Sequence, residues 1–183
     1  GIARLGRANP GRIPGLARFV SRRLGRSTKL DRSYRVYASQ RRIRFTEMEY
    51  AIPRRHAAEA VPRVLEAAER DEAGVGFPIE VRFVAGDDSM LSPAHDRDTT
   101  YVAVHQYRGM AWEAYFRAVE EGMDSYGGRP HWGKRHFQTA ERLAERYPRW
   151  ADFAAVRARL DPEGRFRNEY TDRVLPPIGG AGT

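Results

Sequence analysis

The sequence predicts an α+β fold in which an antiparallel sheet carries its helices on one face. Residues 78–85 alternate apolar and polar side chains with a period of two, which is typical of a strand. Residues 55–71 and 111–126 instead repeat apolar side chains every three to four positions, as amphipathic helices do. The predicted order is strand, strand, helix, strand, strand, helix and a helical end. Two such units favour an antiparallel sheet covered by helices.

The first 33 residues are rich in Gly, Pro and Arg and are predicted to form a basic arm or connection. A short amphipathic helix is expected over 16–24. Residues 1–44 hold 13 basic residues and one acid, a net charge of +12, whereas 45–183 hold 19 basic and 23 acidic residues, a net charge of −4. Such an arm can bind an anionic membrane surface or nucleic acid. No known nucleic-acid motif follows it, so we favour an arm that covers a neighbouring domain.

Two strands are expected next, at 33–38 and 43–52. In the second strand the even-numbered residues from 44 to 50 share one face, and Glu47 and Glu49 lie on the other. Two glutamates on one strand face are usually solvated. The alternative is that one of them lines a polar cavity.

A helix follows over 55–71, with Pro62 expected to kink it, and a turn is expected over 71–76. The strand 78–85 has one apolar face that we expect to pack on the core, formed by Ile79, Val81, Phe83 and Ala85. Its other face carries Glu80 and Arg82, about 7 Å apart by the rise of a strand. They form either an exposed ion pair of little energetic value or an acid and a fixed cation that face a ligand.

The next strand, 100–107, places His105 on one face with Tyr101, Ala103 and Tyr107. His105 is interpreted equally well as a satisfied sheet histidine and as a ligand contact. The helix 111–126 has a core stripe formed by Trp112, Phe116, Val119, Met123 and Tyr126.

Gly127 and Gly128 end this helix. Further helices are expected at 139–146 and 151–159, followed by a turn-rich and then extended segment at 161–170. Residues 176–183 are predicted to be disordered.

An unusual octapeptide, Arg129 to His136 (RPHWGKRH), follows the two glycines. It contains two of the five histidines, one of the three tryptophans and one of only two lysines in a chain with 30 arginines. Because this chain uses Arg almost wherever a positive charge is wanted, Lys134 indicates a need for a compact ammonium. Lys134 could otherwise be an ordinary solvated side chain.

Several classes of site are excluded. The chain has no Cys, which rules out disulfides, thiol catalysis and thiolate metal sites. No dinucleotide fingerprint, P-loop, HExxH motif or nucleophile elbow occurs, and no metal site is expected from the spacing of His, Asp and Glu. No apolar run approaches the ~18 residues of a membrane-spanning helix, and no signal peptide is visible. A cytoplasmic or peripheral membrane location is expected.

Three motifs in order resemble one family. His131-Trp132-Gly133-Lys134 is similar to the His-Trp-[Gly/Ala]-Lys signature of the sugar-1,4-lactone oxidases, which act on D-arabinono-, L-gulono- and L-galactono-lactones, and of related alditol oxidases. Glu80-Val81-Arg82 resembles the Glu-x-Arg strand of that family. The segment from Asp161 to Asn168 (DPEGRFRN) resembles its C-terminal Asp-Pro-x-Gly-x-Phe-x-Asn.

The resemblance implies an FAD-dependent oxidoreductase that oxidises an aldono-1,4-lactone or an alditol by hydride transfer to flavin N5. Residues 34–175 would be its C-terminal substrate (cap) domain, and FAD would be bound mainly by a domain or subunit absent from this chain. Arg82 would polarise the substrate oxygen, Glu80 would orient Arg82, and Lys134 would face the substrate or the flavin.

The resemblance also implies weaker assignments. His131 is expected to contact substrate, Trp132 to pack, and Asn168 to help bind the cofactor domain. His105 and Glu49 are further substrate-binding candidates, and Glu47 is a weaker one. Two alternatives remain open: a truncated or split non-catalytic remnant that pairs with a flavin domain, and a basic protein that binds nucleic acid or a membrane surface through its arm.

Overall fold

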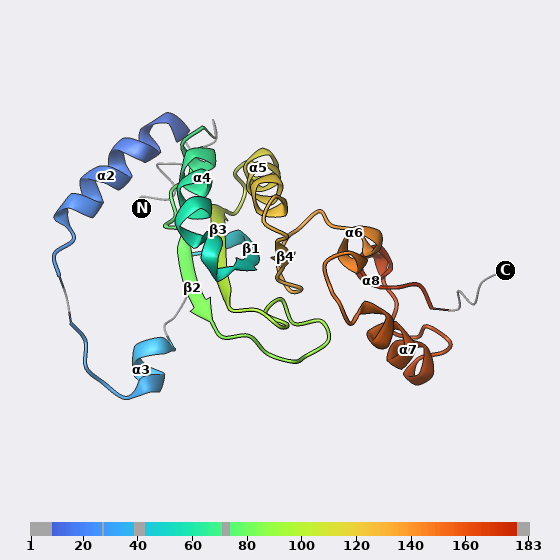
Figure 1. The fold of residues 1–183 in the computed structure, drawn as a ribbon. Coiled ribbons are helices and arrows are strands. Elements are labelled where there is room, and N and C mark those ends of the chain that lie inside the picture. The colour runs from blue at the N-terminus through green and yellow to red at the C-terminus, as the bar shows by residue number, and fades with distance from the viewer. Residues whose placement is uncertain (1–8, 27, 39–42, 71–73, 179–183) are drawn as a thin grey trace.

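The fold is a four-stranded antiparallel sheet with two long helices on one face, and a computed structural model describes it for residues 9–26, 28–38, 43–70 and 74–178 (Figure 1). The strands are β1 (Phe45–Pro53), β2 (Glu80–Val84), β3 (Thr99–Tyr107) and β4 (Arg129–Pro130), in the order β2-β3-β1-β4. Helix α4 (Ala57–Arg70) joins β1 to β2, and α5 (Glu113–Asp124) joins β3 to β4. This β-α-β-β-α-β order is the ferredoxin-like arrangement. The predicted fold class is confirmed.

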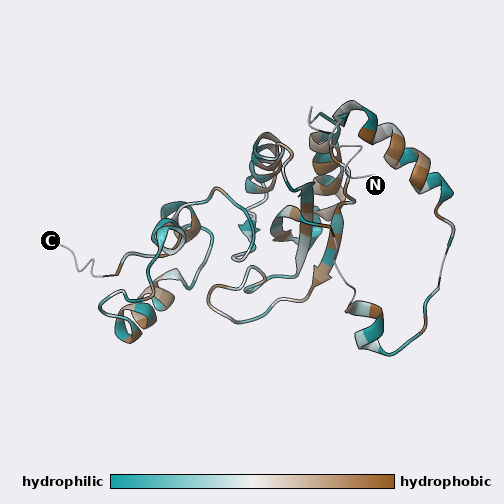
Figure 2. Cartoon of the chain, turned by 180° about the vertical axis from the view of Figure 1, so that it is seen from behind, coloured by the Kyte–Doolittle hydropathy of each residue, from teal (hydrophilic) through white to brown (hydrophobic). Residues whose placement is uncertain are grey.

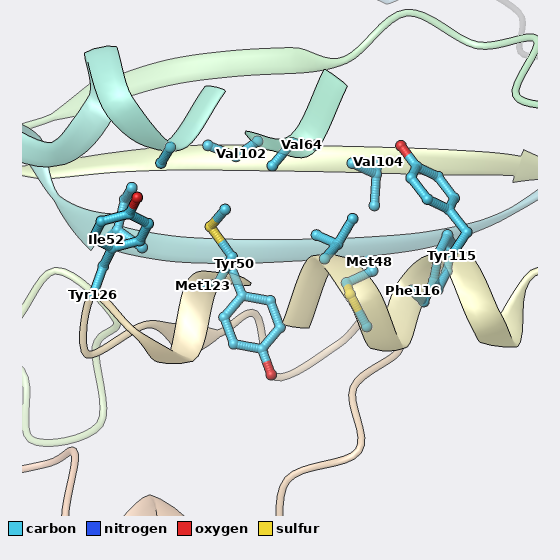
Figure 3. Close-up of a cluster of buried hydrophobic side chains, with 12 residues drawn as sticks. Met48, Tyr50, Ile52, Val64, Val102, Val104, Tyr115, Phe116, Met123 and Tyr126 are labelled. Atoms are coloured by element: carbon cyan, nitrogen blue, oxygen red, sulfur yellow. The ribbon is translucent and has the colours of Figure 1, made fainter. Parts of the chain in front are cut away.

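The core lies between the sheet and helices α4 and α5 (Figure 3). Met48, Tyr50 and Ile52 of β1 are fully buried there, which confirms the predicted division of this strand into two faces. The predicted apolar stripe of α5 is also confirmed, because each of its residues belongs to this cluster or packs against it. Pro62 lies inside α4, which is preceded by the short 3₁₀ helix η2 (Arg54–His56).

The predicted strand at 33–38 is wrong. These residues form the short helix α3 (Ser33–Tyr37), in which the backbone N–H groups of Arg35 and Val36 both donate to the carbonyl of Arg32. Strand β1 has no edge left for them. It pairs with β3 along its whole length and, on the other edge, with β4 and Arg135. Alternation of apolar and polar residues therefore did not suffice without a strand to pair with.

The core face predicted for the strand 78–85 is only partly right. Ile79 packs against the core, but Val81 is 36% exposed and Phe83 is 57% exposed. The reason is the position of β2, which pairs only with β3 and forms the edge of the sheet. The guanidinium of Arg54 lies over the exposed Phe83 ring, 5.2 Å from its centre.

The amphipathic helix of the arm is confirmed as α2 (Ile13–Arg23), which follows the 3₁₀ helix η1 (Pro10–Arg12). Its apolar side is visible as brown segments in Figure 2, and Phe19 on that side is 55% exposed.

The C-terminal part forms a second, smaller core. Helices α6 (Ala140–Ala144), α7 (Trp150–Leu160) and α8 (Glu169–Val174) lie together on the far side of β4 from α2 (Figure 1). The buried members of this core are Leu143, Tyr147 and Val174.

The extended segment predicted to run to residue 170 is corrected, because α8 begins at Glu169. Asn168 caps α8: its side-chain oxygen accepts from the backbone N–H of Thr171 at 2.9 Å, and the Thr171 hydroxyl accepts in turn from the backbone N–H of Asn168. This reciprocal capping box starts a helix that periodicity over so few residues does not reveal. Of the predicted disordered tail, residues 179–183 lie outside the described residues.

Replacing Gly128 is expected to destabilise the fold, and Gly122 provides the control. A Cβ on Gly128 would lie 2.7 Å from the Met123 carbonyl oxygen and 3.0 Å from the Tyr50 ring, so Gly128→Ala should lower the free energy of unfolding by about 1–3 kcal/mol. A Cβ on Gly122, inside α5, meets nothing within 4 Å, so Gly122→Ala should raise the free energy of unfolding by about 0.5–1 kcal/mol. Urea denaturation measures both changes. Equal effects would contradict the assigned packing.

Candidate active site

The face of the sheet opposite the core carries the predicted polar residues. The strand register pairs Glu47 with His105, and pairs Ala103 with Glu49 on one side and with Glu80 on the other. Because paired residues on neighbouring strands project to the same face, side chains from β1, β2 and β3 meet there.

The octapeptide brings Lys134 to this face by following the edge of β1. Pro130 pairs with Tyr50, after which the backbone N–H of His131 donates to the Glu49 carbonyl and that of Arg135 donates to the Glu47 carbonyl, each at 2.9 Å. Lys134 therefore lies beside both glutamates of β1.

These residues form one chain of ion pairs and hydrogen bonds, which we call the polar cluster. The buried carboxylate of Glu49 accepts from the ammonium of Lys134 and from Nη2 of Arg82. Oε1 of Glu47 accepts from Lys134 Nζ at 2.6 Å and lies 3.0 Å from Nε2 of His105. Arg82 Nε also lies 3.4 Å from Oε1 of Glu80. Glu49 thus joins a cation from β2 to a cation from the octapeptide.

Glu49 remains ionised although it is fully buried. Burial acts to raise its pKa, but the hydrogen bonds and charges of Lys134 and Arg82 outweigh this effect and hold the pKa of the carboxyl below its usual 4.5. The same contact with Glu49 raises the pKa of Arg82 against the opposing effect of burial. The two cations are thereby fixed in place by one carboxylate.

The free donors of the polar cluster are few and well defined. The Lys134 ammonium has three N–H groups, of which two are used by Glu47 and Glu49. Among the described residues, Nη1 of Arg82 has no hydrogen-bond partner, and the Arg82 side chain is 50% exposed. The three carboxylates and the two cations of the polar cluster together carry a formal charge of −1. The polar cluster can therefore bind an electron-rich oxygen through two N–H groups without presenting excess positive charge.

The His105 imidazole contacts two aromatic rings. The Phe45 ring lies edge-on to the imidazole at 5.0 Å, and the Phe77 ring lies 5.9 Å from it. Because Nε2 faces the Glu47 carboxylate, Nε2 is assigned as the donor to it, and the buried Nδ1 has no hydrogen-bond partner among the described residues. His105 is only 8% exposed, and it joins the polar cluster through the carboxylate of Glu47. Its direct contact with a substrate stays a prediction.

The sequence profile of the family described as D-arabinono-1,4-lactone oxidase matches residues 1–174. This chain belongs to the D-arabinono-1,4-lactone oxidase family. The resemblance inferred from the three motifs is confirmed.

Three relatives illustrate the range of this family. The chain is 58% identical to an L-gulono-1,4-lactone dehydrogenase of Mycobacterium tuberculosis, over 96% of the chain and 41% of the relative. It is 33% identical to the L-gulonolactone oxidase of Bos taurus, over 89% of the chain and 40% of that protein. It is 42% identical to an alditol oxidase of Streptomyces, over 70% of the chain and 31% of that protein. The chain thus spans about two fifths of the length of the first two.

In this lactone oxidase family member, Trp132 and His131 of the His-Trp-Gly-Lys motif make different kinds of contact. Trp132 packs as expected: its Nε1 donates to the Leu91 carbonyl at 2.8 Å, and its ring lies 5.4 Å from that of Tyr147. His131 is half-buried, and its Nδ1 accepts from the backbone N–H of Gly133 at 3.1 Å. This contact shapes the turn before Lys134, and the role of His131 in substrate binding stays a prediction.

His136, the other histidine of the octapeptide, stays neutral. Burial, with a smaller contribution from Arg173, lowers its pKa to about 4. Its Nε2 lies 2.9 Å from the Tyr170 hydroxyl. Asn168 was predicted to help bind the cofactor. Its side-chain oxygen caps α8, and its contact with a flavin domain stays a prediction.

Sequence reasoning underestimated one member of the polar cluster and one residue beside it. Glu47 was only a weak candidate, yet it holds both Lys134 and His105. Tyr101 was not singled out, although the Arg82 guanidinium lies 5.8 Å from its ring centre, and burial followed by the charge of Glu49 raises its pKa. The register β1–β3–β2 was the missing signal, because it aligns these residues on one face.

Among the described residues, no helix is long and apolar enough to cross a membrane.

Proposed function

We propose that this chain is the substrate-binding part of an FAD-dependent oxidoreductase that oxidises an aldono-1,4-lactone of the D-arabinono- or L-gulono- type. The observation that carries the proposal is the joining of Arg82 and Lys134 by the buried Glu49 on the face of the sheet opposite the core. The two residues come from two of the motifs that resemble the family. The relatives named as lactone dehydrogenase and lactone oxidase support the same reaction class.

Arg82 is the group most open to a substrate. Its half-exposed guanidinium keeps Nη1 available for a hydroxyl or ring oxygen, while Glu49 fixes the orientation of the fork. Glu80, 48% exposed beside it, can accept a hydrogen bond from a sugar hydroxyl. A donor and an acceptor side by side match the carbinol group of a lactone.

Lys134 has a more restricted role. Its one free N–H can donate to a substrate oxygen or to a carbonyl oxygen at the edge of a flavin ring, and its charge is balanced by Glu47 and Glu49. The donor set therefore fits FAD, which when bound supplies the hydride acceptor of the reaction. The contribution of this chain is to bind and orient the carbinol with preorganised donors.

The proposal is tested under anaerobic conditions with this chain joined to its FAD-binding domain or subunit and loaded with FAD, which we call the flavin-loaded protein. Addition of L-gulono-1,4-lactone or D-arabinono-1,4-lactone is expected to bleach the yellow flavin absorbance with saturation kinetics, and an alditol such as xylitol should do so much less efficiently. Bleaching by xylitol with a higher kcat/KM than either lactone would reassign the substrate class. A flavin that no sugar lactone or alditol reduces would contradict the proposed reaction.

A further inference from the structure

A groove of about 1270 Å³ opens beside the polar cluster. It lies between the start of β1, the loop after β4, the start of α5, and α8. Its charged lining is mostly positive. Among the described residues it consists of Glu47 and six basic residues: Arg44, Arg108, Arg117, Lys134, Arg135 and Arg173. Since Glu47 already binds Lys134 and His105, it does not offset the five arginines.

Two of these arginines are held in place by aromatic rings. The Arg117 guanidinium lies 3.9 Å from the centre of the Phe137 ring, and that of Arg135 lies 5.4 Å from the centre of the Trp112 ring. The two rings stack on each other with an angle of 13° between their planes. Cation–π contacts use the flat face of a guanidinium, so the in-plane N–H groups stay available for a ligand.

The groove arginines form no ion pair with the described carboxylates. In the described part of the chain, the side chains of Arg44, Arg108, Arg117 and Arg135 make no ion pair and no hydrogen bond. His136, also in the lining, is neutral because its pKa lies at about 4. Gathering like charges around one hollow costs free energy, and an anion bound between them removes this cost.

We propose that this groove binds a di- or triphosphate group, with Arg117 and Arg135 as its principal contacts. Planar guanidinium groups bind phosphate oxygens through paired N–H donors, and ring contacts that fix both groups beforehand reduce the entropy lost on binding. The groove is large enough for a nucleotide as well as for free polyphosphate. The groove borders the proposed lactone site, because Lys134 and Glu47 line it, but Arg117 and Arg135 lie outside the polar cluster, so the proposal does not depend on lactone binding.

Calorimetric titration of the 183-residue chain with inorganic pyrophosphate tests the site. Saturable binding is expected, with an affinity that falls as NaCl is raised. Arg117→Gln and Arg135→Gln should each weaken binding about tenfold. The double variant Arg18→Gln/Arg22→Gln removes two charges from α2, outside the groove lining, and should bind as the wild type does. Arg108, which contacts no aromatic ring among the described residues, lines the same groove, so Arg108→Gln tests the site if the ring-bound variants prove unstable.

The source of the phosphate is distinguished with ADP, ATP, inorganic triphosphate and adenosine. Tighter binding of ADP than of pyrophosphate indicates a nucleotide, and equal binding indicates free polyphosphate; either result supports the site. A pyrophosphate Kd above about 1 mM at low salt would overturn it, and the groove would then suit an acidic protein surface instead. Equal weakening by the α2 control and the groove variants would also overturn it, because binding would then follow net charge alone.

Discussion

Replacing Lys134 or Arg82 by alanine in the flavin-loaded protein is expected to lower kcat by on the order of 100-fold or more. Each change removes one of the two free donors that the polar cluster directs away from the sheet. These donors act on the substrate where charge develops during oxidation, so their loss should affect kcat in addition to KM. Steady-state kinetics with a sugar lactone measure the effect.

The controls separate catalysis from folding and from net charge. Lys29→Ala removes the only other lysine, whose ammonium donates to the Arg35 carbonyl in the arm, and should leave kcat unchanged. Lys134→Arg keeps the charge but places a planar fork between Glu47 and Glu49, and we expect it to restore little activity. Near-normal kcat in both alanine variants would refute the assigned roles, provided that thermal melts show folded protein.

The faces of the central strands could be predicted from the sequence. Alternation in 43–52 correctly separated Met48 and Tyr50, which are buried in the core, from Glu47 and Glu49. Alternation in 100–107 correctly separated His105 from the core residues Val102 and Val104. The prediction succeeded because both strands lie inside the sheet, where one face must be buried. It failed for residues 33–38, which form α3 and pair with no strand among the described residues, and for the apolar residues of β2, which forms an edge.

The sequence predicted most residues of the polar cluster, but it did not predict which of them pair with each other. The scarcity of lysine and the family motifs identified Lys134, Arg82 and Glu80. Pairing of Arg82 with Glu80 was expected from their spacing of two, yet the closer partner is Glu49, 33 residues away. Only the strand register and the path of the octapeptide along β1 place Glu49 between the two cations. Such contacts depend on tertiary structure, and one sequence without its fold does not specify them.

Glu49→Gln is expected to lower the free energy of unfolding at pH 7 by about 3 kcal/mol. The amide has nearly the shape of the carboxylate but carries no charge, so Lys134 and Arg82 lose the buried partner that they share. Glu80→Gln is the matched control, because Glu80 is 48% exposed and 3.4 Å from Arg82; its effect should stay below about 1 kcal/mol. Urea denaturation of the three proteins measures both values.

The pH dependence of the free energy of unfolding tests whether the charge of the Glu49 carboxylate stabilises the fold. The pKa of Glu49 is lower in the folded protein than its usual 4.5, so at acid pH the unfolded state binds more protons. Its contribution to stability is complete above about pH 4.5 and is lost as the pH falls through the folded-state pKa. The difference in stability between wild type and Glu49→Gln should therefore shrink as the pH falls below 4.5. A constant difference from pH 7 to pH 3 would mean that packing, and not the charge of Glu49, stabilises this face of the sheet.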